Sequence, residues 1–127
     1  MPKILSIVET AYRATIEEQD DTILWISQML KNAGADITLL LRANAVNYAI
    51  KGQDASGLAF GDIKMTRPPE IDKDVERMID KGVPVYLVKE DAEDRGLSNG
   101  NPIAGIKKIS RSGLPALFNQ HDQIWHW

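Results

Sequence analysis

The stretch from Gly82 to Gly96, GVPVYLVKEDAEDRG, decides the fold that we expect from this sequence. Val83 to Val88 is apolar apart from one tyrosine, which is typical of a strand buried on both faces of a parallel sheet. The polar residues that follow predict a turn and a single helical turn at Glu90 to Asp94. Because open α/β folds bind ligands beyond the carboxyl ends of their strands, Val88 to Asp91 marks the edge where we expect a site.

The rest of the chain repeats this alternation of strand and helix. In the first predicted helix, Ile23, Ile26 and Leu30 recur at helical spacing and form its core-facing stripe. The patterns predict strands at Lys3–Val8, Asp36–Leu41, Val83–Val88, Ile106–Ser110 and Asp122–Trp127, and helices at about Asp20–Gly34, Ala43–Lys51, Glu70–Lys81 and Ser112–Gln120. We therefore expect one domain over residues 1–127 with an α/β fold, a three-layer α/β/α sandwich around a mostly parallel sheet of about five strands. The order of the strands does not follow from these patterns.

The connection from Gln53 to Pro69 is the least regular part of the sequence. It has glycines, the pair Pro68-Pro69 and mixed polarity, and connections of this length in compact domains are usually functional or mobile. Leu58, Phe60 and Met65 provide enough apolar surface for it to fold back over the expected site or over a neighbouring subunit.

The composition excludes several classes of function. The net charge is −3 and no basic run occurs, so nucleic-acid binding is not supported. The chain has no cysteine, which excludes disulfides, thiolate nucleophiles and persulfide carriage on this chain. No apolar segment approaches the roughly 20 residues of a membrane span, and MPKILSIVET does not resemble a signal peptide. We expect a soluble, cytoplasmic protein.

Lys89 is the most interesting candidate for chemistry. It lies where the crevice of an open parallel sheet is expected, and a lysine there could bind an anion, act as a base or form a Schiff base. The alternative is a solvated lysine paired with a nearby acid. Thr10 and Tyr12 follow the first strand, and Asn44 follows the second, so all three would approach the same edge. A ligand pocket formed by these four residues is a hypothesis that rests on their positions alone. The alternative is that they have ordinary roles in turns and helix caps.

Other polar patterns do not predict a site. His121 and His126 flank Asp122, but no nucleophile motif accompanies them, and their spacing is not that of a zinc site. The glycines between Gly96 and Gly105 match neither a P-loop nor a dinucleotide-binding fingerprint. We therefore expect no cofactor and no metal.

Trp125 and Trp127 alternate through the last predicted strand, so they share one face of it. They pack either on a helix of their own subunit or in a contact between subunits, where tryptophan is enriched at hot spots. The family resemblance described below favours the subunit contact.

The order of elements resembles the DsrE/DsrF-like family, which includes the Tus-type sulfur-relay proteins. The resemblance covers nearly the whole chain. It is carried by KILSIVET at the start, Leu30 to Gly34 with the strand Asp36–Leu41, KGVPVY at Lys81 to Tyr86, Arg95-Gly96-Leu97 and Asp122-Gln123-Ile124. It implies a compact α/β subunit that forms homo-oligomers, or hetero-oligomers with related subunits or sulfur-carrier proteins.

The resemblance also implies a cysteine that carries a persulfide at the end of the third strand, which falls here at or next to Val88 or Lys89. Neither residue can hold sulfane sulfur, so the chain departs from the family at its reactive position. Two hypotheses follow. The chain is a non-catalytic oligomeric subunit, a docking or scaffold protein in intracellular sulfur relay, with no persulfide chemistry of its own. Alternatively, it is a small-molecule binding protein or an enzyme that uses Lys89.

Overall fold

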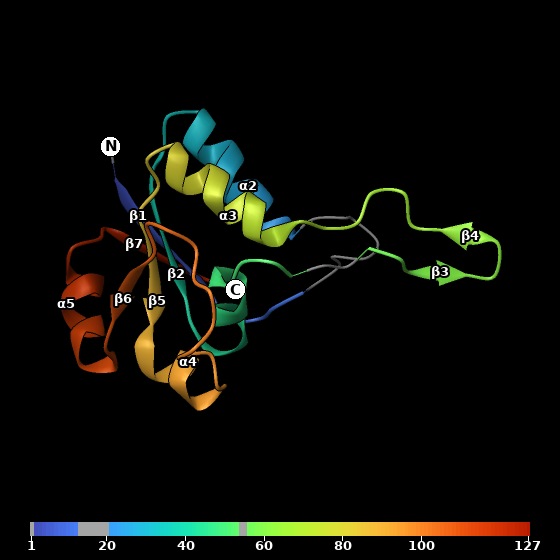
Figure 1. Ribbon diagram of the computed structural model, residues 1–127. Helices are drawn as coiled ribbons and strands as arrows, with labels where there is room; N and C mark the ends of the chain where they lie inside the picture. Colours follow the sequence, from blue (N-terminus) through green and yellow to red (C-terminus); the bar gives the residue numbers. More distant parts are fainter. Residues whose placement is uncertain (1, 13–20, 54–55) are drawn as a thin grey trace.

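The computed structural model describes residues 2–12, 21–53 and 56–127, and its centre is a five-stranded parallel sheet (Figure 1). The order of strands is β6-β5-β2-β1-β7, so the strand that begins the chain lies next to the one that ends it. Every pair of neighbouring strands is parallel. The strands are β1 (Lys3–Val8), β2 (Asp36–Leu41), β5 (Val85–Val88), β6 (Lys107–Ile109) and β7 (Gln123–His126).

Helices cover both faces of this sheet. Helices α2 (Thr22–Asn32) and α3 (Ile71–Asp80) pack on one face, and α5 (Leu114–Asn119) lies on the other, after the short 3-10 helix η2 (Arg111–Gly113) (Figure 1). The larger apolar cluster lies under α2 and α3, and the smaller one joins Leu5, Ile7, Leu40 and Val88 to α5. The predicted three-layer α/β/α sandwich is therefore confirmed.

The core face of α2 is rotated from the predicted stripe. Ile23 is buried as expected, but Leu24 and Ser27 are buried with it, whereas Ile26 and Leu30 are only half-buried. The helix begins at a capping residue, because the side chain of Asp21 accepts hydrogen bonds from the backbone N–H groups of Ile23 and Leu24.

Two short helices lie at the carboxyl edge of the sheet. The 3-10 helix η1 (Ala43–Ala49) follows β2, and α4 (Lys89–Asp94) follows β5 without any intervening residue. Val88 is thus both the last residue of β5 and the cap of α4. Side chains at the start of α4 are in this way held directly by the central sheet. Among the described helices, none is long and apolar enough to cross a membrane.

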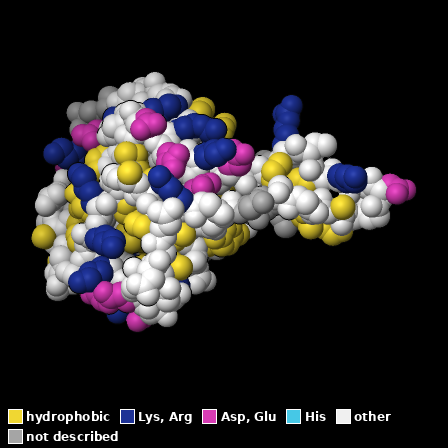
Figure 2. Space-filling view, viewed as in Figure 1, with side chains coloured by type: hydrophobic (Ala, Val, Ile, Leu, Met, Phe, Trp, Pro, Cys, Tyr) yellow, Lys and Arg dark blue, Asp and Glu magenta, His cyan; other side chains and the backbone are white. Residues whose placement is uncertain are grey.

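The connection that we predicted to be irregular contains a β-hairpin. Strands β3 (Ala59–Phe60) and β4 (Ile63–Lys64) pair antiparallel around Gly61-Asp62, and Gly61 has a φ of +62°. A glycine with positive φ at the first turn position is typical of a type II′ hairpin. The hairpin does not fold back over the carboxyl edge of the sheet but projects from the body as an arm (Figures 1 and 2). The side chains of Phe60 and Ile63 are 67% and 74% exposed.

Candidate functional site

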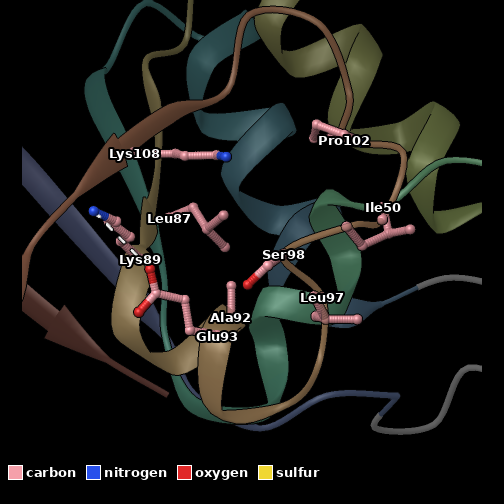
Figure 3. Close-up of a pocket in the computed structure, with 10 residues that line it drawn as sticks. Ile50, Leu87, Lys89, Ala92, Glu93, Leu97, Ser98, Pro102 and Lys108 are labelled. Atoms are coloured by element: carbon pink, nitrogen blue, oxygen red, sulfur yellow. Dashed lines mark ion pairs between the residues drawn. The ribbon is translucent and has the colours of Figure 1, made fainter.

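A small pocket opens at the carboxyl end of β5, where the strand passes into α4 (Figure 3). Its volume is about 90 Å³, whereas drug-sized ligands occupy pockets of about 300–1,000 Å³. The pocket could therefore hold only a small molecule or ion, or one side chain of a partner protein. Its lining is mostly apolar, with two lysines, one acid and one serine: Ile50, Leu87, Lys89, Ala92, Glu93, Leu97, Ser98, Gly100, Pro102 and Lys108.

The two lysines take different directions in this pocket. The ammonium of Lys89 lies 4.0 Å from the carboxylate of Glu93, one helical turn further along α4, and the Lys89 side chain is 59% exposed. Figure 3 shows this ion pair on the side of the pocket away from Leu97, while Lys108 extends across it from β6. Lys89 thus lies at the predicted edge with an acidic neighbour, and Lys108 provides a second cation that the sequence pattern did not single out.

The other three predicted site residues lie outside this pocket. Thr10 is exposed after β1. The backbone N–H of Tyr12 donates to the hydroxyl of Tyr48, and the hydroxyl of Tyr12 donates to Gln53. Asn44 accepts a hydrogen bond from the guanidinium of Arg95 at 3.0 Å. Among the described residues, the pocket therefore brings Lys89 together with Lys108, and Asn44 contacts the residue that follows α4.

Asp91 organises the space between η1, α4 and η2. Its buried carboxylate accepts a hydrogen bond of 2.8 Å from the backbone N–H of Ala43 and another from the guanidinium of Arg111. The backbone N–H of Arg111 donates to Glu90 at 3.0 Å. The sequence patterns did not single out this group. The only signal in the sequence is an acid within the first turn after a buried strand, which is also a common surface pattern.

The charge of Asp91 is stabilised where it lies. Burial raises the pKa of its carboxyl, but the Ala43 N–H and the Arg111 guanidinium lower it by more, so the pKa lies below the ordinary value of 3.8. Asp91 is therefore an acceptor that ties three segments together, and it is poorly suited to give or take a proton near neutral pH.

A second buried group lies under the segment that follows β1. The hydroxyl of Tyr48 in η1 donates to the carboxylate of Asp21 at 2.5 Å and accepts from the backbone N–H of Tyr12. Burial, the hydrogen bond to Asp21 and the charge of Asp21 raise the pKa of Tyr48 well above its ordinary value of 10.0. Tyr48 is thus held neutral, and its role is to connect η1 with the start of α2.

The last strand, β7, carries the predicted interface residues. Trp125 packs partly against the larger apolar cluster, and Trp127 is 39% exposed. The imidazole of His126 lies 2.9 Å from the carboxylate of Glu9, and that of His121 contacts the carbonyl oxygen of Leu117 at 2.8 Å. Within the described ranges, no cluster of three or more acidic or histidine side chains could hold a metal ion.

Comparisons with known proteins are informative about the fold. No protein-family model matches the sequence, and no curated protein matches it. The solved structure of YchN from E. coli matches 100% of both chains with 21% identical residues and a TM-score of 0.75. BT1422 from Bacteroides thetaiotaomicron matches over 98% of this chain and 95% of its own, with 16% identity and a TM-score of 0.64. MTH1491 from Methanobacterium thermoautotrophicum matches over 98% and 99%, with 11% identity and a TM-score of 0.63.

At these identities the matches show the fold, and BT1422 and MTH1491 are themselves described as proteins of unknown function. The full-length match to YchN agrees with the resemblance that the sequence motifs carry. The chain therefore shares the α/β fold of these three proteins.

Proposed function

We propose that the protein is a docking subunit of an oligomer in intracellular sulfur relay, and that it transfers no sulfur itself. The observation that carries this proposal is the arm formed by β3 and β4. Its cross-strand pair, Phe60 and Ile63, exposes two large apolar residues. Figure 1 shows β3 and β4 at the end of the arm, away from the central sheet.

An arm of this kind gains stability from a partner. An isolated two-stranded hairpin is marginally stable in water, and each large apolar side chain that becomes buried contributes about 1.5–3 kcal/mol. Phe60 and Ile63 are paired across the hairpin and so point to the same face of it. A groove on another polypeptide that accepts this face would bury both side chains at once.

The reactive position of the fold supports a role without chemistry. The chain has no cysteine, Val88 is buried in the apolar cluster under α5, and Lys89 lies beside Glu93. The connection to sulfur relay rests on the resemblance of the sequence motifs and on the shared fold. A subunit that keeps the fold and lacks the thiol can still bind the proteins that carry one.

Photo-crosslinking in the native host tests the proposal. A photoreactive phenylalanine analogue replaces Phe60 in the arm, and in a matched variant it replaces Trp25, which is an exposed aromatic residue on α2. We expect position 60 to cross-link to a protein that has a sulfur-transfer cysteine, and position 25 not to do so. A cross-link from position 60 only to further copies of this chain, or no cross-link there, would overturn the docking role.

The pocket at the end of β5 favours a second function, the binding of a small anion. Lys108 extends across the pocket, Ser98 offers a hydroxyl, and Lys89 stands at its edge (Figure 3). Titration with sulfate, thiosulfate, phosphate and acetate, followed by NMR, tests this function. Saturable shifts that disappear in both Lys89→Ala and Lys108→Ala, with the fold unchanged, would support it, whereas shifts that survive in both variants would exclude it.

A further inference from the structure

The sheet has two edges, and they differ in how they are protected. β6 forms one edge and β7 the other, and no described strand pairs with the outer side of either. β6 contains Lys107 and Lys108, and charged lysines are a common device that prevents edge strands from pairing with other chains. β7 has the sequence QIWH, without lysine, acid or proline, and Ile124 is 44% exposed. The usual protection is therefore present at β6 and missing at β7.

The backbone of β7 also has hydrogen-bonding groups that point outward. Trp127 donates to the carbonyl oxygen of Ile7 at 2.9 Å and accepts from the N–H of Glu9 at 3.1 Å, so its polar backbone groups face β1. Alternate residues of a strand face opposite sides. The N–H and C=O groups of Ile124 and His126 therefore face away from β1, along the open edge.

We propose that β7 pairs antiparallel with β7 of a second copy of this chain, around a two-fold axis at Trp125. In this register, Ile124 of each copy lies opposite His126 of the other. Both residues have outward-facing backbone groups, so each pair exchanges two hydrogen bonds, and the two pairs together make four. The two sheets then form one continuous sheet across the dimer.

The neighbouring register makes fewer bonds. If the two-fold axis lay at Ile124, Ile124 of one copy would lie opposite Ile124 of the other. His126 of each copy would then lie opposite Asp122 of the other. The N–H of Asp122 already donates to the carbonyl oxygen of Lys3 at 2.8 Å. The axis at Trp125 is thus the arrangement that satisfies both outward-facing residues of β7.

The side chains of β7 are compatible in charge with those of a second copy. An open hollow of about 380 Å³ lies along the strand, lined by Trp125, His126 and Trp127. In the proposed register, the two copies of Trp125 meet at the axis, and Trp127 lies opposite Gln123. No two like charges on the paired strands come together, whereas the same pairing at β6 would bring lysines against lysines. Self-complementarity of this kind is what a two-fold interface requires.

The size of this contact places it among weak interfaces. A stable interface of standard size uses about 20–30 residues on each side, and β7 provides only a few. We therefore expect a dimer that dissociates on dilution unless other surfaces add to it. The inference rests on the proposed function because both require the chain to assemble with another chain. The dimer contact lies at the edge strand β7, whereas the docking role was assigned to the arm formed by β3 and β4.

The absence of cysteine makes the register directly measurable. Residues opposite each other in a non-hydrogen-bonded antiparallel pair have Cα atoms about 4.5 Å apart, within the range of a disulfide. Trp125→Cys should therefore form a disulfide with its own copy. Gln123→Cys and Trp127→Cys should not do so alone, because equivalent atoms would be about 13 Å apart. A mixture of these two variants should form the mixed dimer.

Lys108→Cys, at the opposite edge, is the matched control and should stay at the 14.1 kDa of the single chain in a non-reducing gel. The mixed pair replaces two side chains at the edge, so it tests the register even if Trp125→Cys does not fold. The mixed disulfide together with an unlinked Lys108→Cys is the expected result. If the mixed pair stays unlinked, or if Lys108→Cys links equally well, the β7 pairing is wrong. Retained photo-crosslinks from position 60 would then show that the docking role stands without it.

Discussion

The hydroxyl of Tyr48 donates a hydrogen bond to the carboxylate of Asp21, 2.5 Å away, and both side chains are buried. Asp21 also caps α2, so one carboxylate connects the start of that helix with η1 at the carboxyl edge of the sheet. The arrangement keeps the Tyr48 phenol protonated, since an anion beside the Asp21 carboxylate would be strongly disfavoured.

Tyr48 should make the fold sensitive to alkaline pH. Its pKa is raised in the folded protein, so its contribution is fully present below pH 10.0 and is lost as the pH rises above that value. The unfolded chain then releases a proton that the folded chain keeps, and the free energy of unfolding falls by about 1.4 kcal/mol per pH unit. Between pH 10.5 and 11.5, urea unfolding should show wild type losing about 1.4 kcal/mol more than Tyr48→Phe. Tyr86→Phe, outside this group, is the control, and equal slopes for wild type and Tyr48→Phe would refute the coupling.

Asp91 should respond to the loss of its cationic partner. Its pKa is lowered, so the stability it contributes is present above pH 3.8 and is lost as the pH falls through the lower folded value. Arg111→Gln removes the guanidinium and leaves the Ala43 N–H, so the pKa of Asp91 should rise. An NMR titration of the Asp91 carboxyl measures this shift. Arg77→Gln, which breaks the ion pair with Asp74 on α3, is the control, and an equal response to both variants would contradict the assignment.

Ala43 should tolerate glycine better than an ordinary helical alanine does. Its φ is +50°, in the left-handed region that costs a residue with a side chain about 1–2 kcal/mol. Ala43→Gly removes this cost, but a glycine loses more backbone entropy on folding, which costs about 0.5–1 kcal/mol. The free energy of unfolding should therefore be unchanged or slightly higher. In exposed Ala116 of α5, the same change should cost about 1 kcal/mol. Chemical denaturation compares the two variants, and an equal loss in both would show that Ala43 is unstrained.

The apolar pair of the arm should contribute little to the stability of the single chain. Phe60→Ser combined with Ile63→Ser should change the free energy of unfolding by less than about 0.5 kcal/mol, because both side chains are exposed. Met78→Ala in α3, at a fully buried position, should cost about 2–5 kcal/mol. The measurement is urea unfolding of dilute protein. A large loss in the arm variant would mean that the arm packs on its own chain.

The strands could be predicted because most of them leave a local signal. Runs such as Asp36–Leu41 are buried on both faces and contain few polar residues. The strand order leaves no such signal, since each parallel pair is joined through a crossover and the strand pairing depends on the packed helices. Thus nothing in the residues of β1 and β7 indicates that these two strands pair, and they are more than 110 residues apart in the chain.

The hairpin had a signal that we did not use. Phe60-Gly61-Asp62-Ile63 places two apolar residues around a Gly-Asp pair, a combination that favours a two-residue β-turn. The glycines and prolines around it suggested an irregular loop instead. The prediction that this segment is apolar enough to cover another surface remains a prediction.

At the candidate site, the sequence indicated the edge of the sheet but not the contacts there. Lys89 lies at the carboxyl end of β5 as expected. Whether Asn44 would reach a ligand or Arg95 depends on how η1 packs against α4, and these residues are 51 positions apart in the chain. The same holds for Asp91 and Ala43, which meet only once the sheet has formed. The ligand role of Thr10, Tyr12, Asn44 and Lys89 remains a prediction.

The junction at Val88, where β5 becomes α4 without a connecting residue, limits how the length of this protein can change. One inserted residue would turn α4 by about 100° about its axis. Asp91 would then leave Ala43 and Arg111, and its carboxylate would lose the partners that compensate for its burial. Insertions and deletions should thus be rejected at this junction, while the segment that carries the arm can lengthen or shorten without moving the sheet.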